Sequence, residues 1–164
     1  MSNAFNPELF KKMPVVGILR FFKRNEVEKL VPASMAGGLC NIEVTMNSEG
    51  AEDLIRLTCD LVGGQGNVGA GTVTTIEEMD RALEAGASFI VTPAVIPEVI
   101  RACVERKVPV MPGAMTGLDT CASWWGGPER YANGPTDFSA RAQRPTSVRP
   151  PRDLSQAART CTFA

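Results

Sequence analysis

The first 116 residues repeat one pattern: a short apolar run, a turn, an amphipathic stretch and another turn. Runs rich in aliphatic residues predict five strands, at 14–20, 39–46, 67–71, 88–93 and 108–113. Apolar residues at helical spacing predict four helices between them, at 25–38, 49–64, 75–87 and 96–107. Strands that alternate with helices of this length are typical of βαβ units and a parallel sheet.

The ends of the predicted helices carry the residue types that start and stop helices. Asn25 is the expected N-cap of the first helix, and Gly37 and Gly38 end it. Thr75 is followed by acidic residues at the start of the third helix, and Pro97 suits the first turn of the fourth.

The spacing of the units also predicts how the sheet is arranged. The strand–helix unit recurs roughly every 20 to 25 residues, and this short period favours a (β/α) barrel over an open doubly wound sheet. A complete (β/α)8 barrel has eight units. The sequence therefore predicts an α/β fold that is an incomplete (β/α)8 TIM barrel of about five βα units.

The composition changes after Thr116. Residues 117–164 contain no lysine and are rich in arginine and proline, and their only Leu, Ile or Val residues are Leu118, Val148 and Leu154. So few aliphatic side chains cannot bury enough surface to offset the entropy of ordering the chain. We expect a partial barrel over residues 1–116 and an irregular, largely disordered tail over 117–164.

Charge and hydropathy narrow the range of partners. The net charge of −1 gives no electrostatic argument for binding to nucleic acid or to a membrane surface. The most apolar stretch, residues 89–100, is short and is interrupted by Pro93 and Pro97. The amino-terminal residues lack the apolar region of a secretory signal. We expect a cytoplasmic protein without nucleic-acid or membrane partners.

Five cysteines occur without Cys-x-x-Cys spacing, and histidine is absent. A zinc site would need ligands scattered along the chain, so we expect no metal. Cys40, Cys59 and Cys103 are expected to be small core residues in a reducing compartment.

Polar residues gather where the predicted strands end. In a parallel barrel the active site lies at the carboxyl ends of the strands. The sequence predicts that an arginine, a carboxylate and several hydroxyls meet at this rim, where the fourth predicted strand ends in a proline. They are Arg20, Glu43, Thr45, Thr72, Thr92 and Pro93.

Glu43 is the most informative of these residues. Strand alternation places Asn41, Glu43 and Thr45 on one face and Ile42 and Val44 on the other. Burying a carboxylate inside an apolar barrel costs free energy, so such a group is expected to have a charged partner or a chemical function. Burial would raise its pKa toward neutrality, as proton transfer requires. The alternative is that Glu43 forms a structural ion pair with Arg20. The ion pair and the proton-transfer role are compatible, because an arginine can orient a base and also bind a substrate carboxylate.

Two other features give weaker signals. A Gly-x-Gly such as that in "VGAGT" does not by itself indicate a phosphate site, and we expect its small residues to allow a tight turn at the barrel mouth. No lysine is expected at the rim as a desolvated nucleophilic amine. The lysines of the chain are Lys11, Lys12, Lys23, Lys29 and Lys107.

Five segments resemble one enzyme family in order and in spacing. They are "PVVGILR", "GGLCNIEVTMNS", "VGAGTVTT", "GASFIVTPAV" and "VPVMPGAMT". Over residues 10–116 the chain resembles the 2-keto-3-deoxy-6-phosphogluconate / 4-hydroxy-2-oxoglutarate aldolases. The resemblance implies a class I aldolase on a (β/α)8 barrel, a lyase of carbohydrate metabolism that releases pyruvate and an aldehyde through a Schiff base.

The resemblance also implies roles for single residues. Glu43 matches the acid/base that moves protons around the carbinolamine, and Arg20 matches the arginine that contacts the pyruvyl carboxylate. Thr72 and Pro93 match residues that line the pyruvate pocket. The expected ligand is a small oxo acid, no cofactor or metal is expected, and the family is commonly homotrimeric.

The sequence departs from the family in two places. Asn47 stands where the family often has an arginine that recognises the charged part of the substrate. The family's Schiff-base lysine lies on a sixth strand, and this chain has no lysine after Lys107. We therefore interpret residues 117–164 as foreign to the family, as after a frameshift or a misjoined exon. We expect this chain to be inactive; the alternative is a non-catalytic partial barrel that acts as a binding or assembly module.

Overall fold

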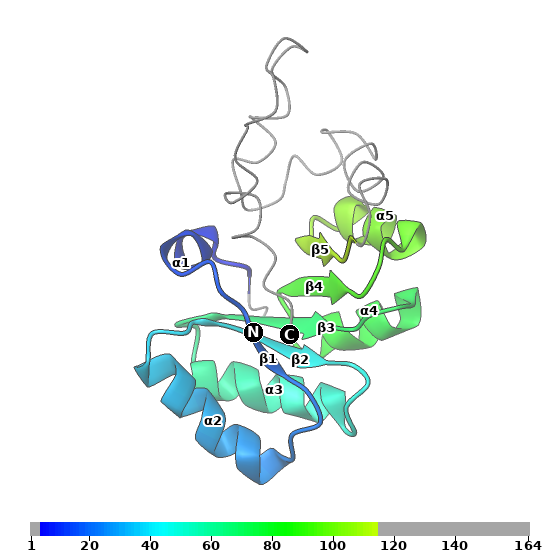
Figure 1. Ribbon diagram of the computed structural model, residues 1–164. Helices are drawn as coiled ribbons and strands as arrows, with labels where there is room; N and C mark the ends of the chain where they lie inside the picture. Colours follow the sequence, from blue (N-terminus) through cyan, green and yellow to red (C-terminus); the bar gives the residue numbers. More distant parts are fainter. Residues whose placement is uncertain (1–3, 115–164) are drawn as a thin grey trace.

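The computed structural model describes residues 4–114, which form one curved parallel sheet with helices packed against it (Figure 1). The strands are β1 (Gly17–Leu19), β2 (Asn41–Thr45), β3 (Asn67–Gly71), β4 (Phe89–Thr92) and β5 (Val110–Pro112). The helices are α1 (Pro7–Lys12), α2 (Arg24–Ala36), α3 (Ala51–Val62), α4 (Ile76–Glu84) and α5 (Pro97–Glu105).

The strands lie side by side in chain order, β1-β2-β3-β4-β5, and every neighbouring pair is parallel. A doubly wound sheet would reverse its strand order at one point, whereas a barrel does not. The structure therefore confirms the α/β class and the five strands in barrel order. The tail predicted over 117–164, and Thr116 before it, lie outside the described residues.

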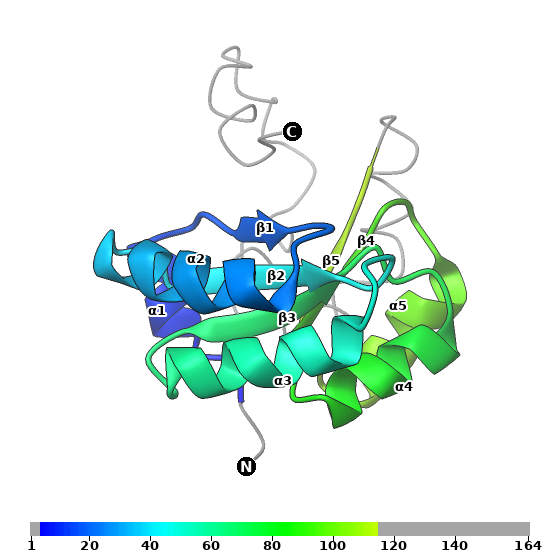
Figure 2. The ribbon, with the colours of Figure 1, turned by 90° about the horizontal axis from the view of Figure 1, so that it is seen from below.

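The hydrophobic core lies between the sheet and helices α2 to α5, which follow the strands along one side (Figure 2). Ile42 and Val44 of β2 and Val68 of β3 point into it and are almost fully buried. Val27 of α2 and Ile55 of α3 are completely buried against them. Each such side chain contributes about 1.5–3 kcal/mol on burial, so this layer stabilises the packing of the strands against the helices.

The predicted helix signals are confirmed at three helices and wrong at one helix start. The Thr75 hydroxyl accepts from the Glu78 N–H at 3.2 Å, Pro97 opens α5, and Gly37 ends α2. Asn25, however, is not the N-cap of α2, because that helix begins earlier, with Lys23 as its cap. The Glu26 carboxylate accepts from the Lys23 N–H at 2.7 Å, which fixes the earlier start.

A network of three asparagines ties the amino-terminal segment to the sheet. Asn67 exchanges two hydrogen bonds with the backbone of Asn6, at 2.6 and 2.9 Å, and donates to the Asn41 amide oxygen at 2.8 Å. Asn41 in turn donates to the carbonyl of Met13 at 2.7 Å. Asn41 and Asn67 are the first residues of β2 and β3. The network therefore closes the amino end of the sheet, beside α1.

Among the described cysteines, Cys103 is buried in the core as expected, and Cys40 and Cys59 are half-buried. Burial raises the pKa of the Cys103 thiol to about 11, so this thiol is protonated at neutral pH. Within residues 4–114, no helix is long and apolar enough to cross a membrane.

Replacing Asn67 tests the asparagine network. Asn67→Ala removes three hydrogen bonds and leaves the buried Asn41 amide oxygen without its donor, so we expect a loss of about 2 kcal/mol or more in the free energy of unfolding. Urea denaturation followed by circular dichroism measures the change. The control is exposed Gln65→Ala, expected within about 0.5 kcal/mol of wild type. Equal stability of the two variants would contradict the assignment.

Candidate active site

Glu43 lies in the middle of β2, on the sheet face that is turned away from the helices. Its neighbours in the sheet register are Ile18 of β1 and Gly69 of β3. Its side chain leans toward the carboxyl end of β3, over Gly71, and only 4% of the residue is exposed. Since Ile42 and Val44 point into the core, the predicted alternation along β2 is confirmed.

The glycines of β3 make room for buried side chains. A Cβ atom on Gly71 would overlap the Glu43 carboxylate, and one on Gly69 would overlap the ring of Phe89. Both glycines lie inside the strand, and neither has a positive φ. The expected tight turn at these glycines is therefore wrong. It is the next residue, Thr72, that adopts the left-handed conformation, with a φ of 58°.

The carboxylate of Glu43 has no hydrogen bond or salt bridge within residues 4–114. Burial raises its pKa from 4.5 to about 7, and the smaller attraction of the Arg20 guanidinium opposes this rise. The group therefore exists in both protonation states near neutral pH. This is the property that a general acid and base needs in order to exchange protons in both directions.

Arg20 follows β1 and reaches across the end of the sheet toward β3. Its side chain is exposed, and Nη2 donates to the Thr72 hydroxyl at 3.2 Å. Among the salt bridges of the described residues none joins Arg20 to Glu43, so the alternative of a direct ion pair is not supported. Arg20 acts on Glu43 through its charge while its guanidinium remains open to a solute.

The remaining predicted residues are placed differently. Thr45 is fully buried, and its hydroxyl lies 3.0 Å from the Ser48 hydroxyl. Thr92 is also buried and donates to the Ala94 carbonyl at 2.6 Å, while Pro93 is exposed at the ends of β4 and β5. No hydrogen bond among residues 4–114 joins Thr92 or Pro93 to Glu43 or Arg20. The structure thus brings together Arg20, Glu43 and Thr72, with Thr92 and Pro93 at the end of β4, two strands from β2 and one strand from β3.

All five lysines are exposed. Lys107 precedes β5 and so lies at the amino end of the sheet, and Lys11 and Lys12 belong to α1. None of the five shares the buried environment of Glu43. A lysine acting as a nucleophile must lose its proton near neutral pH, which burial promotes and exposure does not.

Two residues near the site were not singled out from the sequence. Ser48 accepts a hydrogen bond from the Phe21 N–H at 3.0 Å, and Phe21 has a φ of 60°. No sequence signal predicts a positive φ at phenylalanine. The spacing of Thr45 and Ser48, three residues apart at a strand end, could have suggested a hydroxyl pair.

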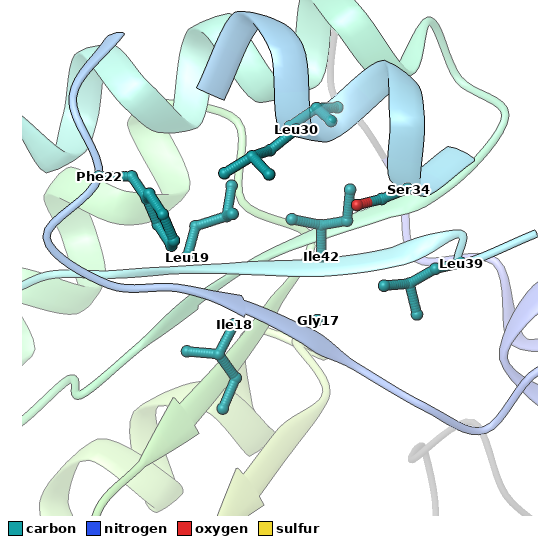
Figure 3. Close-up of a pocket in the computed structure, with 9 residues that line it drawn as sticks. Gly17, Ile18, Leu19, Phe22, Leu30, Ser34, Leu39 and Ile42 are labelled. Atoms are coloured by element: carbon teal, nitrogen blue, oxygen red, sulfur yellow. The ribbon is translucent and has the colours of Figure 1, made fainter. Parts of the chain in front are cut away.

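An apolar groove of about 180 Å³ lies between β1 and α2 (Figure 3). Leu19, Leu30 and Ile42 line it; Ile18 also borders it, but its side chain points to the opposite side of the sheet. Ile18 pairs in register with Glu43, so the groove lies on the other face from the carboxylate. It is therefore not part of the candidate active site.

Comparisons with known proteins agree with this geometry. The sequence model of the KDPG and KHG aldolases matches residues 7–133, a range that extends past Thr116. The 2-dehydro-3-deoxy-6-phosphogalactonate aldolase of Escherichia coli (strain K12) is 34% identical over 108 residues, which are 66% of this chain and 53% of that protein. The KHG/KDPG aldolase of the same organism is 34% identical over 103 residues, 63% of this chain and 48% of its own length.

Solved structures of the same enzymes share the fold. A 2-keto-3-deoxy-6-phospho-gluconate aldolase from Zymomonas mobilis ATCC 29191 aligns with a TM-score of 0.64 at 30% identity, over 70% of this chain and 54% of that one. A KDPG aldolase from Legionella pneumophila, with pyruvate captured as a covalent carbinolamine, aligns with a TM-score of 0.64 at 25% identity, over 85% and 71%.

The alignments also define how much of the fold is present. The chain spans about half the length of the curated relatives it matches, and its five parallel strands align with TIM-barrel aldolases. The buried glutamate thus lies on the second strand of such a barrel, and the arginine and the left-handed threonine directly follow the first and third strands. The chain belongs to the KDPG and KHG aldolase family.

Proposed function

We propose that residues 7–112 carry the proton-transfer side of a class I aldolase site. In the complete family enzyme this site would cleave 2-keto-3-deoxy-6-phosphogluconate or 4-hydroxy-2-oxoglutarate to pyruvate and an aldehyde. The observation that carries the proposal is the buried, unpaired Glu43 carboxyl with a pKa of about 7. The relatives' names and the pyruvate carbinolamine of the Legionella enzyme support the choice of an oxo acid.

Glu43 would move protons between the nitrogen and the oxygen of the bound carbonyl. When an amine adds to the keto carbon, its nitrogen loses a proton and the former carbonyl oxygen gains one, which gives a carbinolamine. Protonated Glu43 then donates to that hydroxyl, the C–O bond breaks with departure of water, and the Schiff base remains with an ionised Glu43. A pKa near the working pH lets the same carboxyl act in both steps.

The residues around Glu43 would bind the oxo acid. The exposed guanidinium of Arg20 is suited to hold the pyruvyl carboxylate by paired hydrogen bonds. Thr72, which already contacts Arg20, and Pro93 would line the pocket, with Thr92 behind Pro93. Thr45 lies below this rim, fully buried, so we assign it a supporting place in the binding site.

The proposed site lacks a buried lysine that could supply the amine for the Schiff base. All five lysines are exposed, and the sequence has none after Lys107. We therefore propose that this chain does not complete the Schiff base itself. The second candidate function is a non-catalytic partial barrel that binds oxo acids or assembles with another polypeptide, and the same lack of a buried amine favours it.

Trapping with borohydride tests the missing amine. The full chain is incubated with pyruvate and sodium borohydride, and intact-mass spectrometry measures covalent adducts. We expect no adduct above that of a heat-unfolded sample of the same chain, because no lysine is desolvated. A stoichiometric adduct that maps to one lysine would show that this chain has its own nucleophile and would overturn the inactive assignment.

The pH dependence of stability tests the buried carboxyl. The pKa of Glu43 is higher in the folded state than its ordinary value of 4.5, so its contribution to stability is complete below 4.5 and is lost as the pH rises through about 7. Glu43→Gln carries no charge, so its stability relative to wild type should increase by roughly 3 kcal/mol between pH 4 and pH 8.

Urea denaturation at pH 4, 6 and 8 measures this difference. Glu49→Gln serves as the control, because Glu49 is an exposed glutamate in the turn after the same strand. The change with pH in the stability of Glu43→Gln relative to wild type should exceed that of Glu49→Gln. If the difference in stability between Glu43→Gln and wild type does not change with pH, folding does not raise the pKa of Glu43 and the assignment is wrong.

A further inference from the structure

Two buried hydroxyls hold the peptide groups on either side of Arg20. Phe21 N–H donates to Ser48 Oγ at 3.0 Å, Ser48 Oγ lies 3.0 Å from Thr45 Oγ1, and Thr45 Oγ1 donates to the Leu19 carbonyl at 3.5 Å. Each hydroxyl has one proton, so a single direction satisfies all three contacts, from Phe21 through Ser48 and Thr45 to Leu19. The hydroxyl pair thus links the carbonyl before Arg20 to the N–H after it.

The hydroxyl pair is itself rigidly held by β2. Thr45 is the last residue of that strand and is fully buried, and Ser48 is 7% exposed. The Ser48 N–H donates to the Thr45 carbonyl at 3.0 Å, which closes the turn that carries both hydroxyls. Because β2 also carries Glu43, the pair sets the end of β1 relative to the carboxyl group of the site.

The conformation of Phe21 shows that the end of β1 is constrained. Phe21 has a φ of 60°, a region that bulky residues rarely occupy, and its side chain is 68% exposed. An exposed ring cannot hold the backbone in this conformation by packing. The hydrogen bond from its N–H to Ser48 is a backbone contact that stabilises this conformation.

This turn determines where the guanidinium of Arg20 lies. Arg20 Nη2 donates to Thr72, which is also in the left-handed region, with a φ of 58°. Both left-handed residues are thus connected to Arg20, one through its backbone and one through its side chain. A shift of the Arg20 peptide would therefore move its charge relative to Glu43.

We infer that Ser48, together with Thr45, is a positioning residue that holds the peptide groups on either side of Arg20 so that its guanidinium lies beside Thr72, where its charge acts on Glu43. The inference rests on the proposed function for its purpose, because Arg20 and Glu43 are the groups proposed to bind and protonate the oxo acid. Its geometry is independent of that function.

The test compares the Glu43 carboxyl in variants of the full chain. The chain is labelled with ¹³C in its glutamate carboxyls, the Glu43 resonance is assigned by its loss in Glu43→Gln, and its pKa is measured by NMR titration. Arg20→Gln removes the attractive charge and should raise the pKa. Ser48→Ala should raise it in the same direction, by roughly 0.5, because Arg20 is no longer held in place.

Three variants separate positioning from general stabilisation. Ser88→Ala removes a hydroxyl that is equally buried, at 7% exposure, and that bonds the Val68 carbonyl at 2.8 Å at the amino end of β4. It should leave the pKa of Glu43 unchanged. Ser48→Thr keeps the hydroxyl and should restore the wild-type pKa. If Ser48→Ala does not fold, Ser48→Cys replaces it, because a thiol has a similar shape but forms weaker hydrogen bonds. This variant should also raise the pKa of Glu43.

The sign of the change distinguishes the outcomes. Loosening that only admits water to Glu43 would lower its pKa, because water relieves the desolvation that raises it. A lowered or unchanged pKa in Ser48→Ala, or an equal rise in Ser88→Ala, would overturn the inference. Pyruvate affinity is measured by calorimetry on the same samples: if wild type does not bind pyruvate, the proposed function fails while the pKa comparison still decides the positioning role.

Discussion

The site is organised around one constraint, the burial of the Glu43 carboxyl without a partner. Burial raises its pKa to about 7, and no hydrogen bond or salt bridge within residues 4–114 compensates for the reduced solvation. Neighbouring positions are restricted by this group. Gly71 must lack a side chain, and Arg20, which donates to Thr72, attracts the carboxylate through its charge without forming a salt bridge with it.

Polar side chains are hydrogen-bonded to one another at the amino end of the sheet, whereas the charged side chains of Glu43 and Arg20 form no ion pair with each other at its carboxyl end. At the amino end, Asn41 and Asn67 satisfy one another and the incoming chain, and the result is a closed network. At the carboxyl end, the charged groups of Glu43 and Arg20 are close but not paired. This division is typical of parallel barrels, in which the amino end stabilises the fold and the carboxyl end carries the chemistry.

Hydrophobic periodicity was enough to predict the strands, the helices, the barrel order and the face of Glu43, because these follow from burial along each element. It did not predict α1, whose position depends on contacts made far along the chain, between Asn6 and Asn67. The sequence also did not predict that Gly71 leaves space for the Glu43 side chain. In a sequence, a glycine that makes room for a neighbouring side chain cannot be distinguished from a glycine that allows a turn. The left-handed Phe21 is set by Ser48, a contact that no local pattern reveals.

Family membership and geometry together describe the first part of an aldolase barrel, in which Glu43 is buried and all five lysines are exposed. The central claim is the altered proton affinity of Glu43, and the most direct measurement is an NMR titration of its carboxyl in the wild-type chain. The account predicts a midpoint of about 7. A midpoint near the ordinary value of 4.5 would mean that the carboxyl is solvated, and it would contradict the account.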